Sequence, residues 1–120
     1  MNEDFLAFLW KFRKLGPDLT LQSGEPLVIL APGTQNLDGG PDFFNARLRI
    51  GETIWAGNVE IHVRSSDWQR HGHSEDPLYQ SAILHVVLTD DMPVCYPDGS
   101  SMPTLVLTGN YPPGLYERFR

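Results

Sequence analysis

Apolar residues recur at three- and four-residue spacing near the N-terminus, and this spacing predicts an amphipathic helix over residues 2–15. The apolar positions of this segment are Phe5, Leu6, Phe8, Leu9, Phe12 and Leu15. Asn2 is a suitable N-cap, because its short side chain can accept a backbone hydrogen bond from the first turn. Gly16 and Pro17 would end the helix. We therefore expect one face of this helix to pack against the core.

Short apolar or alternating segments predict strands in much of the remaining chain. These segments are residues 25–31, 43–50, 53–63 and 82–89. The first is largely apolar, which is typical of a buried strand, and the second and third are joined by a two-residue connection that predicts a hairpin. Gly57 interrupts the third segment and indicates a bulge or a close approach of another backbone.

Turn-forming and capping residues divide the rest of the chain. Ser65–Asp67 supplies capping side chains, so we expect one or two short helices between residues 67 and 81. The proline-rich segment after residue 89 predicts a hairpin that turns at residues 97–99 and returns as a strand over residues 105–107. The order is helix, strand, strand, strand, helix, strand, followed by a C-terminal β-hairpin. This order predicts an α/β (α+β) domain with a mixed sheet.

Length and composition narrow the class of protein. With 120 residues, 41% of them hydrophobic and 20% charged, the chain has the composition of one globular domain and not of a disordered protein. We expect residues 1–110 to form that domain and residues 111–120 to be a C-terminal tail, with further chain segments after residue 120 in the native protein. No apolar run approaches the roughly 20 residues of a membrane span, so we expect no membrane contact. The lone Cys95 excludes an internal disulfide, and the acidic N-terminus favours a cytoplasmic protein over a secreted one.

The charge of the chain is acidic but unevenly distributed. Nine basic and fifteen acidic side chains give a formal net charge of −6, which argues against nucleic-acid binding by bulk electrostatics. The segment from residue 41 to residue 73 is an exception, because its four arginines offset its four acidic residues. The charge balance of this segment alone is therefore compatible with contact to phosphate groups.

Candidate chemistry is concentrated at the two ends of the predicted hairpin. Asp42 comes directly before one strand, and Glu60 and His62 lie two residues apart on its partner, so their side chains share a face. Because Val59, Ile61 and Val63 (the alternate positions) are apolar, we expect Glu60 and His62 on the more open face, or buried there at an energetic cost. A turn near residue 51 places position 42 opposite roughly position 60. Two converging carboxylates would form a hard-oxygen site suited to Mg²⁺ or Mn²⁺, an ion that can polarise a phosphate.

This pattern resembles the restriction-endonuclease-like superfamily, whose sites follow the order Pro-Asp, a spacer, then Asp/Glu-x-Lys on the next strand (the PD-(D/E)xK pattern). Pro41-Asp42 matches the first part, and Glu60-Ile61-His62 matches the second part except at its last position. The resemblance implies a nuclease-like core with Asp42 and Glu60 as metal ligands. It also makes Glu3 a weaker candidate, since an acidic residue of the first helix sometimes completes such sites.

The departure from this pattern lies at His62, which stands where the superfamily has lysine. A histidine can do similar work as a neutral base or as a proton donor, given its unperturbed pKa of about 6.5. Arg64, one alternation further along the same face, offers the positive charge that the lysine would carry.

The chain is also similar to the N-terminal part of a bacterial family known as a domain of unknown function, family 2851. The residues that carry this similarity are Gly40–Ala46, Trp55–His62, Ser66–Trp68, His71–His73, Asp76-Pro77 and Ile83–Val87. The similarity covers most of the 120 residues but implies no particular activity.

Three functions of different classes follow as hypotheses. The first is hydrolysis of DNA or RNA with Mg²⁺ or Mn²⁺, in which Asp42 and Glu60 bind the metal, His62 positions or deprotonates water, and Arg47 and Arg49 contact phosphate. The second is a catalytically degenerate nuclease fold that serves as a binding or scaffold module. The third and less favoured hypothesis is a zinc-dependent hydrolase, because zinc binds imidazole ligands. Its candidate ligands are His62, His71, His73 and His85.

Overall fold

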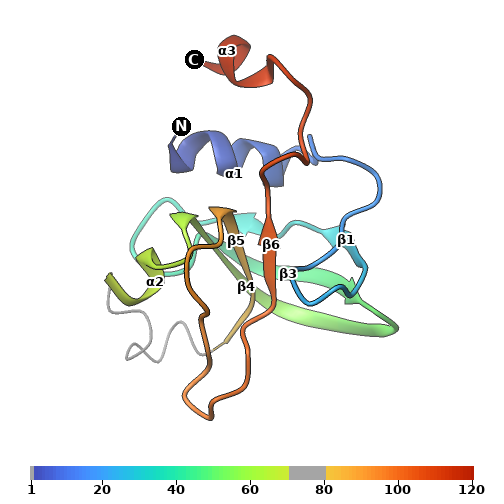
Figure 1. Cartoon of the computed structure of the whole chain (residues 1–120), viewed down its shortest axis with the longest axis vertical. Helices are drawn as coiled ribbons and strands as arrows, with labels where there is room; N and C mark the ends of the chain where they lie inside the picture. The colour runs from blue at the N-terminus through green and yellow to red at the C-terminus, as the bar shows by residue number, and fades with distance from the viewer. Residues whose placement is uncertain (1, 71–80) are drawn as a thin grey trace.

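The computed structural model describes residues 2–70 and 81–120, which form an α+β fold built on one open sheet (Figure 1). The helices of this part of the chain are α1 (Glu3–Lys11), α2 (Asp67–Arg70) and α3 (Leu115–Phe119). Its strands are β1 (Leu27–Ala31), β2 (Thr34–Gln35), β3 (Phe43–Ile50), β4 (Thr53–Arg64), β5 (Ala82–Thr89) and β6 (Thr104–Val106). Most of the segment in which short helices were predicted after α2 lies outside the described residues.

The sheet is mixed, as predicted from the order of the elements. Its strands follow the order β1-β3-β4-β5-β6, and β2 also pairs with β3. The strands β1, β3 and β4 pair antiparallel, whereas β5 is parallel to β4 and β6 is parallel to β5. The long strand β4 therefore lies in the middle of the sheet and pairs with β3 through its first half and with β5 through its second half.

Helix α1 begins as predicted and ends earlier. The Asn2 side chain accepts a hydrogen bond of 3.0 Å from the backbone N–H of Phe5, which confirms the N-cap. The helix ends at Lys11 instead of continuing to residue 15, because Arg13 adopts a left-handed backbone conformation with a φ of 54°. The apolar spacing continues past this point and does not reveal the break.

Gly57 lies where the beginning of β5 and the residue before it approach strand β4 closely. A Cβ atom at this position would come within 2.6 Å of Ile83 Cγ2 and 2.9 Å of the Ser81 carbonyl oxygen. The close approach predicted from the interrupting glycine is confirmed. By contrast, β1 is an edge strand and not the buried strand that its composition predicts, since Val28 is 45% and Leu30 38% exposed.

The predicted C-terminal β-hairpin is confirmed at its turn, and its return strand forms as β6 close to the predicted residues. The Tyr96 N–H donates to the Ser100 carbonyl across the turn, and Cys95 pairs antiparallel with Ser101. Beyond these contacts, β6 joins the main sheet, where Thr104 pairs with His85 in a parallel register.

Two layers of side chains cover the sheet. On one face, the apolar residues of α1 form a core with alternate residues of the central strands; its largest members are Trp10, Phe5, Phe43, Leu6 and Leu9. On the other face, Trp68 of α2 packs with Ala82, Val94 and Met102. Both faces of β4 are therefore buried near its C-terminal half.

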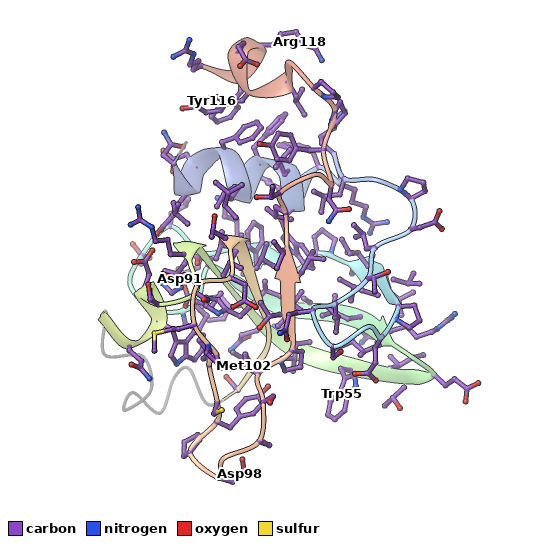
Figure 2. All side chains as sticks on the ribbon, viewed as in Figure 1. Trp55, Asp91, Asp98, Met102, Tyr116 and Arg118 are labelled. Carbon is purple, nitrogen blue, oxygen red and sulfur yellow. The ribbon has the colours of Figure 1, made fainter. Side chains whose placement is uncertain are left out.

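The segment 111–120, predicted as a tail, contains α3 and packs onto the outer side of α1 (Figure 1). The Tyr116 ring lies 4.9 Å from the Phe5 ring, and the Phe119 ring lies 5.2 Å from it, measured between centroids. Figure 2 shows Tyr116 between the two helices. Of the helices that the structure describes, none has both the length and the apolar character needed to cross a bilayer.

Candidate metal and proton-transfer site

The antiparallel pairing of β3 and β4 brings Asp42 next to Glu60. Phe43 pairs with Val59, so the preceding residue lies beside Glu60 and Ile61. The Asp42 carboxylate accepts a hydrogen bond of 2.7 Å from the backbone N–H of Ile61. The hairpin thus holds this carboxylate through the backbone of the strand that carries Glu60.

Glu60 is buried, with 3% of its surface exposed, which is the second of the two environments that strand alternation left open for it. The pKa of Glu60 is raised to about 11. Burial is the largest cause, and the hydrogen bond to Asp42 and the negative charge of Asp42 act in the same direction. A hydrogen bond from the Ile61 backbone acts in the opposite direction. Glu60 is therefore protonated at neutral pH, and the two carboxyl groups form an acid pair.

Glu3 contributes to the same electrostatic environment from the first turn of α1. Its negative charge also raises the pKa of Glu60, although less than burial and Asp42 do. Within residues 2–70 and 81–120, no group of three or more Asp, Glu, His or Cys side chains is arranged to hold a metal ion. Two oxygen donors from the protein, with water completing the shell, are nevertheless a usual arrangement for Mg²⁺. Asp42 and Glu60 supply oxygen donors of this kind, and Glu60 would have to release its proton to bind such an ion.

His62 lies one alternation beyond Glu60 and is also buried, at 1% exposure. Its Nε2 atom lies 4.0 Å from Glu60 Oε1, which is an electrostatic contact and too long for a hydrogen bond. Its Nδ1 atom lies 2.8 Å from Nε2 of His85, so one of these two nitrogens donates a hydrogen bond to the other. His85 thereby fixes the orientation of the His62 ring.

Trp68 completes the packing around the two imidazole rings. Its ring contacts His85 at 5.0 Å and His62 at 6.4 Å between centroids, both with the rings steeply inclined. The sequence analysis grouped His85 with His62 only as candidate zinc ligands and did not predict a hydrogen bond between their rings. This contact follows from the parallel pairing of β4 and β5, in which Glu60 pairs with His85.

The histidines do not form the zinc site of the third hypothesis within the described residues. Two imidazole nitrogens on one tetrahedral zinc ion would lie about 3.3 Å apart, given Zn–N lengths near 2.05 Å. The facing nitrogens of His62 and His85 are closer, at 2.8 Å, and form a hydrogen bond. The other two candidates, His71 and His73, lie outside the described residues.

The candidate phosphate-binding arginines lie on the exposed part of the hairpin. Arg47 pairs with Ala56 and Arg49 with Ile54, and both side chains are exposed. Alternation along β4 places them on the same sheet face as Glu60, with Ala56 about 13 Å from Glu60 at the usual rise per residue. Arg64 is exposed at the end of β4, two residues beyond His62.

Residues 3–120 match the model of a family described as "Protein of unknown function (DUF2851)". The chain belongs to this family. The match covers nearly the whole DUF2851 chain and confirms the family similarity predicted from the sequence, and it includes Asp42, Glu60 and His62. No curated protein and no solved structure matches this DUF2851 chain.

Proposed function

We propose that this DUF2851 chain hydrolyses phosphodiester bonds of nucleic acid with the help of Mg²⁺ or Mn²⁺. The observation that carries the proposal is the convergence of Asp42 and Glu60 across the hairpin, with the pKa of Glu60 raised to about 11. A buried acid pair destabilises a fold, because burial penalises the charged form and each negative charge penalises the other. A divalent cation between the two groups would remove both penalties.

The order of elements supports a nuclease-like assignment of the fold. A helix, three antiparallel strands, a short helix and a parallel strand follow one another in α1, β1, β3, β4, α2 and β5. This is the order that the restriction-endonuclease-like resemblance implies, and Asp42 and Glu60 occupy the positions of its acidic residues. Glu3, on the first helix, acts electrostatically on Glu60 as a weaker member of the same site.

His62 is the residue of this site best placed to hold a proton near the acid pair. Its Nδ1 side is occupied by the hydrogen bond with His85, so its Nε2 side faces Glu60. A metal ion at Asp42 and Glu60 would supply Lewis-acid polarisation of the scissile phosphate. His62 would then orient or deprotonate the attacking water, and Arg64 would supply the positive charge of the missing lysine.

Arg47 and Arg49 would bind phosphates that flank the cleaved bond and not the cleaved one itself. The distance of about 13 Å along β4 between the level of Arg47 and Glu60 is too long for both to contact one phosphate. A polynucleotide lying along the exposed hairpin face would reach both places, because its phosphates repeat along the strand. This arrangement favours DNA or RNA over a single small phosphodiester.

The test is cleavage of single-stranded DNA, double-stranded DNA and RNA by the purified chain with Mg²⁺ or Mn²⁺. Asp42→Asn and Glu60→Gln should each lower the rate by about a hundredfold or more, because changes to residues that only support a metal ligand already cost about 10- to 100-fold. Glu52→Gln removes an exposed carboxylate at the hairpin turn and should leave the rate unchanged. Absence of cleavage with either metal would contradict the proposal.

A second candidate is a catalytically degenerate nuclease fold that serves as a binding or scaffold module. The burial of Glu60 and the presence of His62 in place of lysine favour it. Titration with Mn²⁺ distinguishes the two, since a degenerate site should show no binding that depends on Asp42 and Glu60. Elemental analysis of the purified protein tests the zinc hypothesis, which requires about one zinc ion per chain.

A further inference from the structure

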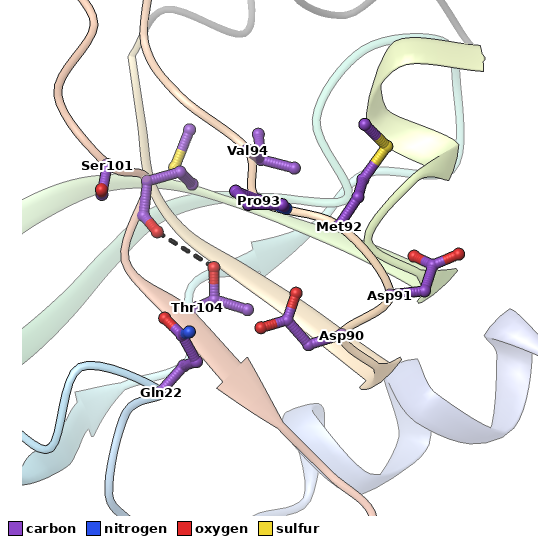
Figure 3. A pocket seen from close by; sticks show the side chains of 9 residues that line it. Gln22, Asp90, Asp91, Met92, Pro93, Val94, Ser101 and Thr104 are labelled. Carbon is purple, nitrogen blue, oxygen red and sulfur yellow. Dashed lines mark hydrogen bonds between the residues drawn. The ribbon is translucent and has the colours of Figure 1, made fainter.

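A pocket of about 350 Å³ lies at the end of β5 (Figure 3). Gln22, Asp90 and Thr104 contribute polar groups to it, and Val94 and Met102 contribute apolar ones. The volume lies at the lower end of the range for sites that bind small organic molecules. We call this the Asp90 pocket.

The carboxylate of Asp90 is the charged group of the pocket that remains available to a ligand. Within the described part of the chain, neither Asp90 nor the side-chain amide of Gln22 forms a hydrogen bond or an ion pair. In Figure 3 the two side chains point toward each other across the pocket. Asp91 differs, because its carboxylate accepts hydrogen bonds from the backbone N–H and hydroxyl of Ser66 and from the hydroxyl of Ser65.

The wall of the pocket around Asp90 is rich in hydrogen-bond acceptors. Thr104 is buried, and its hydroxyl donates a hydrogen bond to the carbonyl oxygen of Met102 at 3.0 Å. Toward the pocket, the Thr104 oxygen can therefore only accept, whereas the side chains of Gln22 and Ser101 can both donate and accept. Among the residues that the structure describes, no lysine, arginine or histidine lines the pocket.

We propose that the Asp90 pocket binds an organic cation with an alkyl body, namely an alkylammonium or alkylguanidinium group. The cation would donate hydrogen bonds to Asp90, Gln22 and Thr104, and its alkyl part would pack on Val94 and Met102. A guanidinium group can bind the carboxylate in a bidentate manner. The net charge of −6 on the protein would also attract cations over anions.

The test is titration of the isotope-labelled full chain with n-butylammonium and n-butylguanidinium, followed by amide chemical shifts. Both cations should bind saturably and shift the amides of Gln22, Asp90 and Thr104, whereas butyrate and 1-butanol should not. Asp90→Asn should weaken binding by about tenfold or more, as expected for loss of a hydrogen bond to a charged group. Asp38→Asn is the matched control, since it removes an exposed carboxylate of another loop, and it should bind like the parent.

The same titration with capped Gly-Arg-Gly and Gly-Lys-Gly peptides identifies the source of the cation. Binding as tight as that of the butyl cations indicates a side chain of a partner protein, and binding at least tenfold weaker indicates a free small molecule. Equal binding to the parent and to Asp90→Asn, equal binding of butyrate, or shifts confined to other parts of the sheet would each overturn the proposal. Circular dichroism of both variants confirms that the fold is retained.

Discussion

At the scale of single residues, Glu60 is the group whose chemistry differs most from that of the same residue in water. Its environment combines burial, a second carboxyl group from Asp42 and the more distant charge of Glu3. All three favour the protonated form. The protein therefore carries a buried acid whose proton is held far more tightly in the folded state than in the unfolded chain.

This difference predicts that the protein becomes less stable as the pH rises. Because the folded-state pKa of Glu60 is about 11 and its ordinary value is 4.5, the unfolded chain loses this proton above pH 4.5 while the folded chain keeps it. The stability that Glu60 contributes is therefore fully present below pH 4.5 and is lost progressively as the pH rises toward 11. The free energy of unfolding should fall with pH by up to about 1.4 kcal/mol per unit from this group. Glu60→Gln should flatten the dependence and raise the melting temperature at pH 8, measured by thermal denaturation from pH 5 to pH 9. A parent-like slope in this variant would contradict the assignment.

The convergence of Asp42 and Glu60 could be predicted from the sequence, because a two-residue connection fixes the register of the hairpin that carries both. Whether Glu60 is exposed or buried could not be decided from the sequence, since its environment includes β5, which is remote in sequence. The contact between His62 and His85 depends on the parallel register of β4 and β5 for the same reason. Local patterns therefore identify the acids, and only the assembled sheet shows their environment.

At the scale of elements, the close approach between β4 and the beginning of β5 limits which residues fit at position 57. The neighbours of a Cβ atom there include backbone as well as side chain, so they cannot simply rotate away. Strand β4 therefore depends on a glycine at this close approach, and the interruption in its apolar pattern has a structural cause.

Gly57→Ala should destabilise the fold by about 1 to 3 kcal/mol, the usual effect of forcing additional atoms into a packed region. Urea denaturation measures the change. Gly39→Ala serves as the control, because a Cβ atom at position 39 would meet no atom within 4 Å. Equal stability of the two variants would show that β4 and the residues before β5 can separate at little energetic cost.

The elements predicted best are those whose signals are local. The N-cap at Asn2 and the hairpin of β3 and β4 are of this kind. The parallel pairing of β6 with β5 was not predicted, because apolar residues at 105–107 indicate that a strand forms but not which strand it pairs with. The early end of α1 at Lys11 was also missed, since the left-handed conformation of Arg13 has no counterpart in the apolar spacing.

At the scale of the whole molecule, the last residues of the chain are part of the packing around the first helix. Tyr111, Tyr116 and Phe119 all place rings within about 5 Å of the Phe5 ring. The Phe5 ring is completely buried. The C-terminal segment therefore forms a layer of the fold beyond α1 and does not behave as a separate tail.

Tyr116→Ala should accordingly lower the free energy of unfolding by about 1 to 2 kcal/mol, from lost apolar burial and lost ring contact with Phe5. Arg118→Ala, a change at an exposed residue of the same short helix, should have almost no effect. Chemical denaturation followed by far-ultraviolet circular dichroism compares the two variants. If both lose the same stability, the contribution comes from helix formation in α3 and not from the aromatic contact.

The contact between α1 and α3 joins two helices that are separated in the chain by the whole sheet. During synthesis on a ribosome, Phe5 therefore emerges before the strands, and the aromatic residues that cover it emerge after them. Until residues 111–119 leave the exit tunnel, the outer side of α1 presents Phe5 and Phe8 to whatever surrounds the nascent polypeptide. A chaperone that binds exposed aromatic side chains would act on this face of α1 mostly before the aromatic cluster closes.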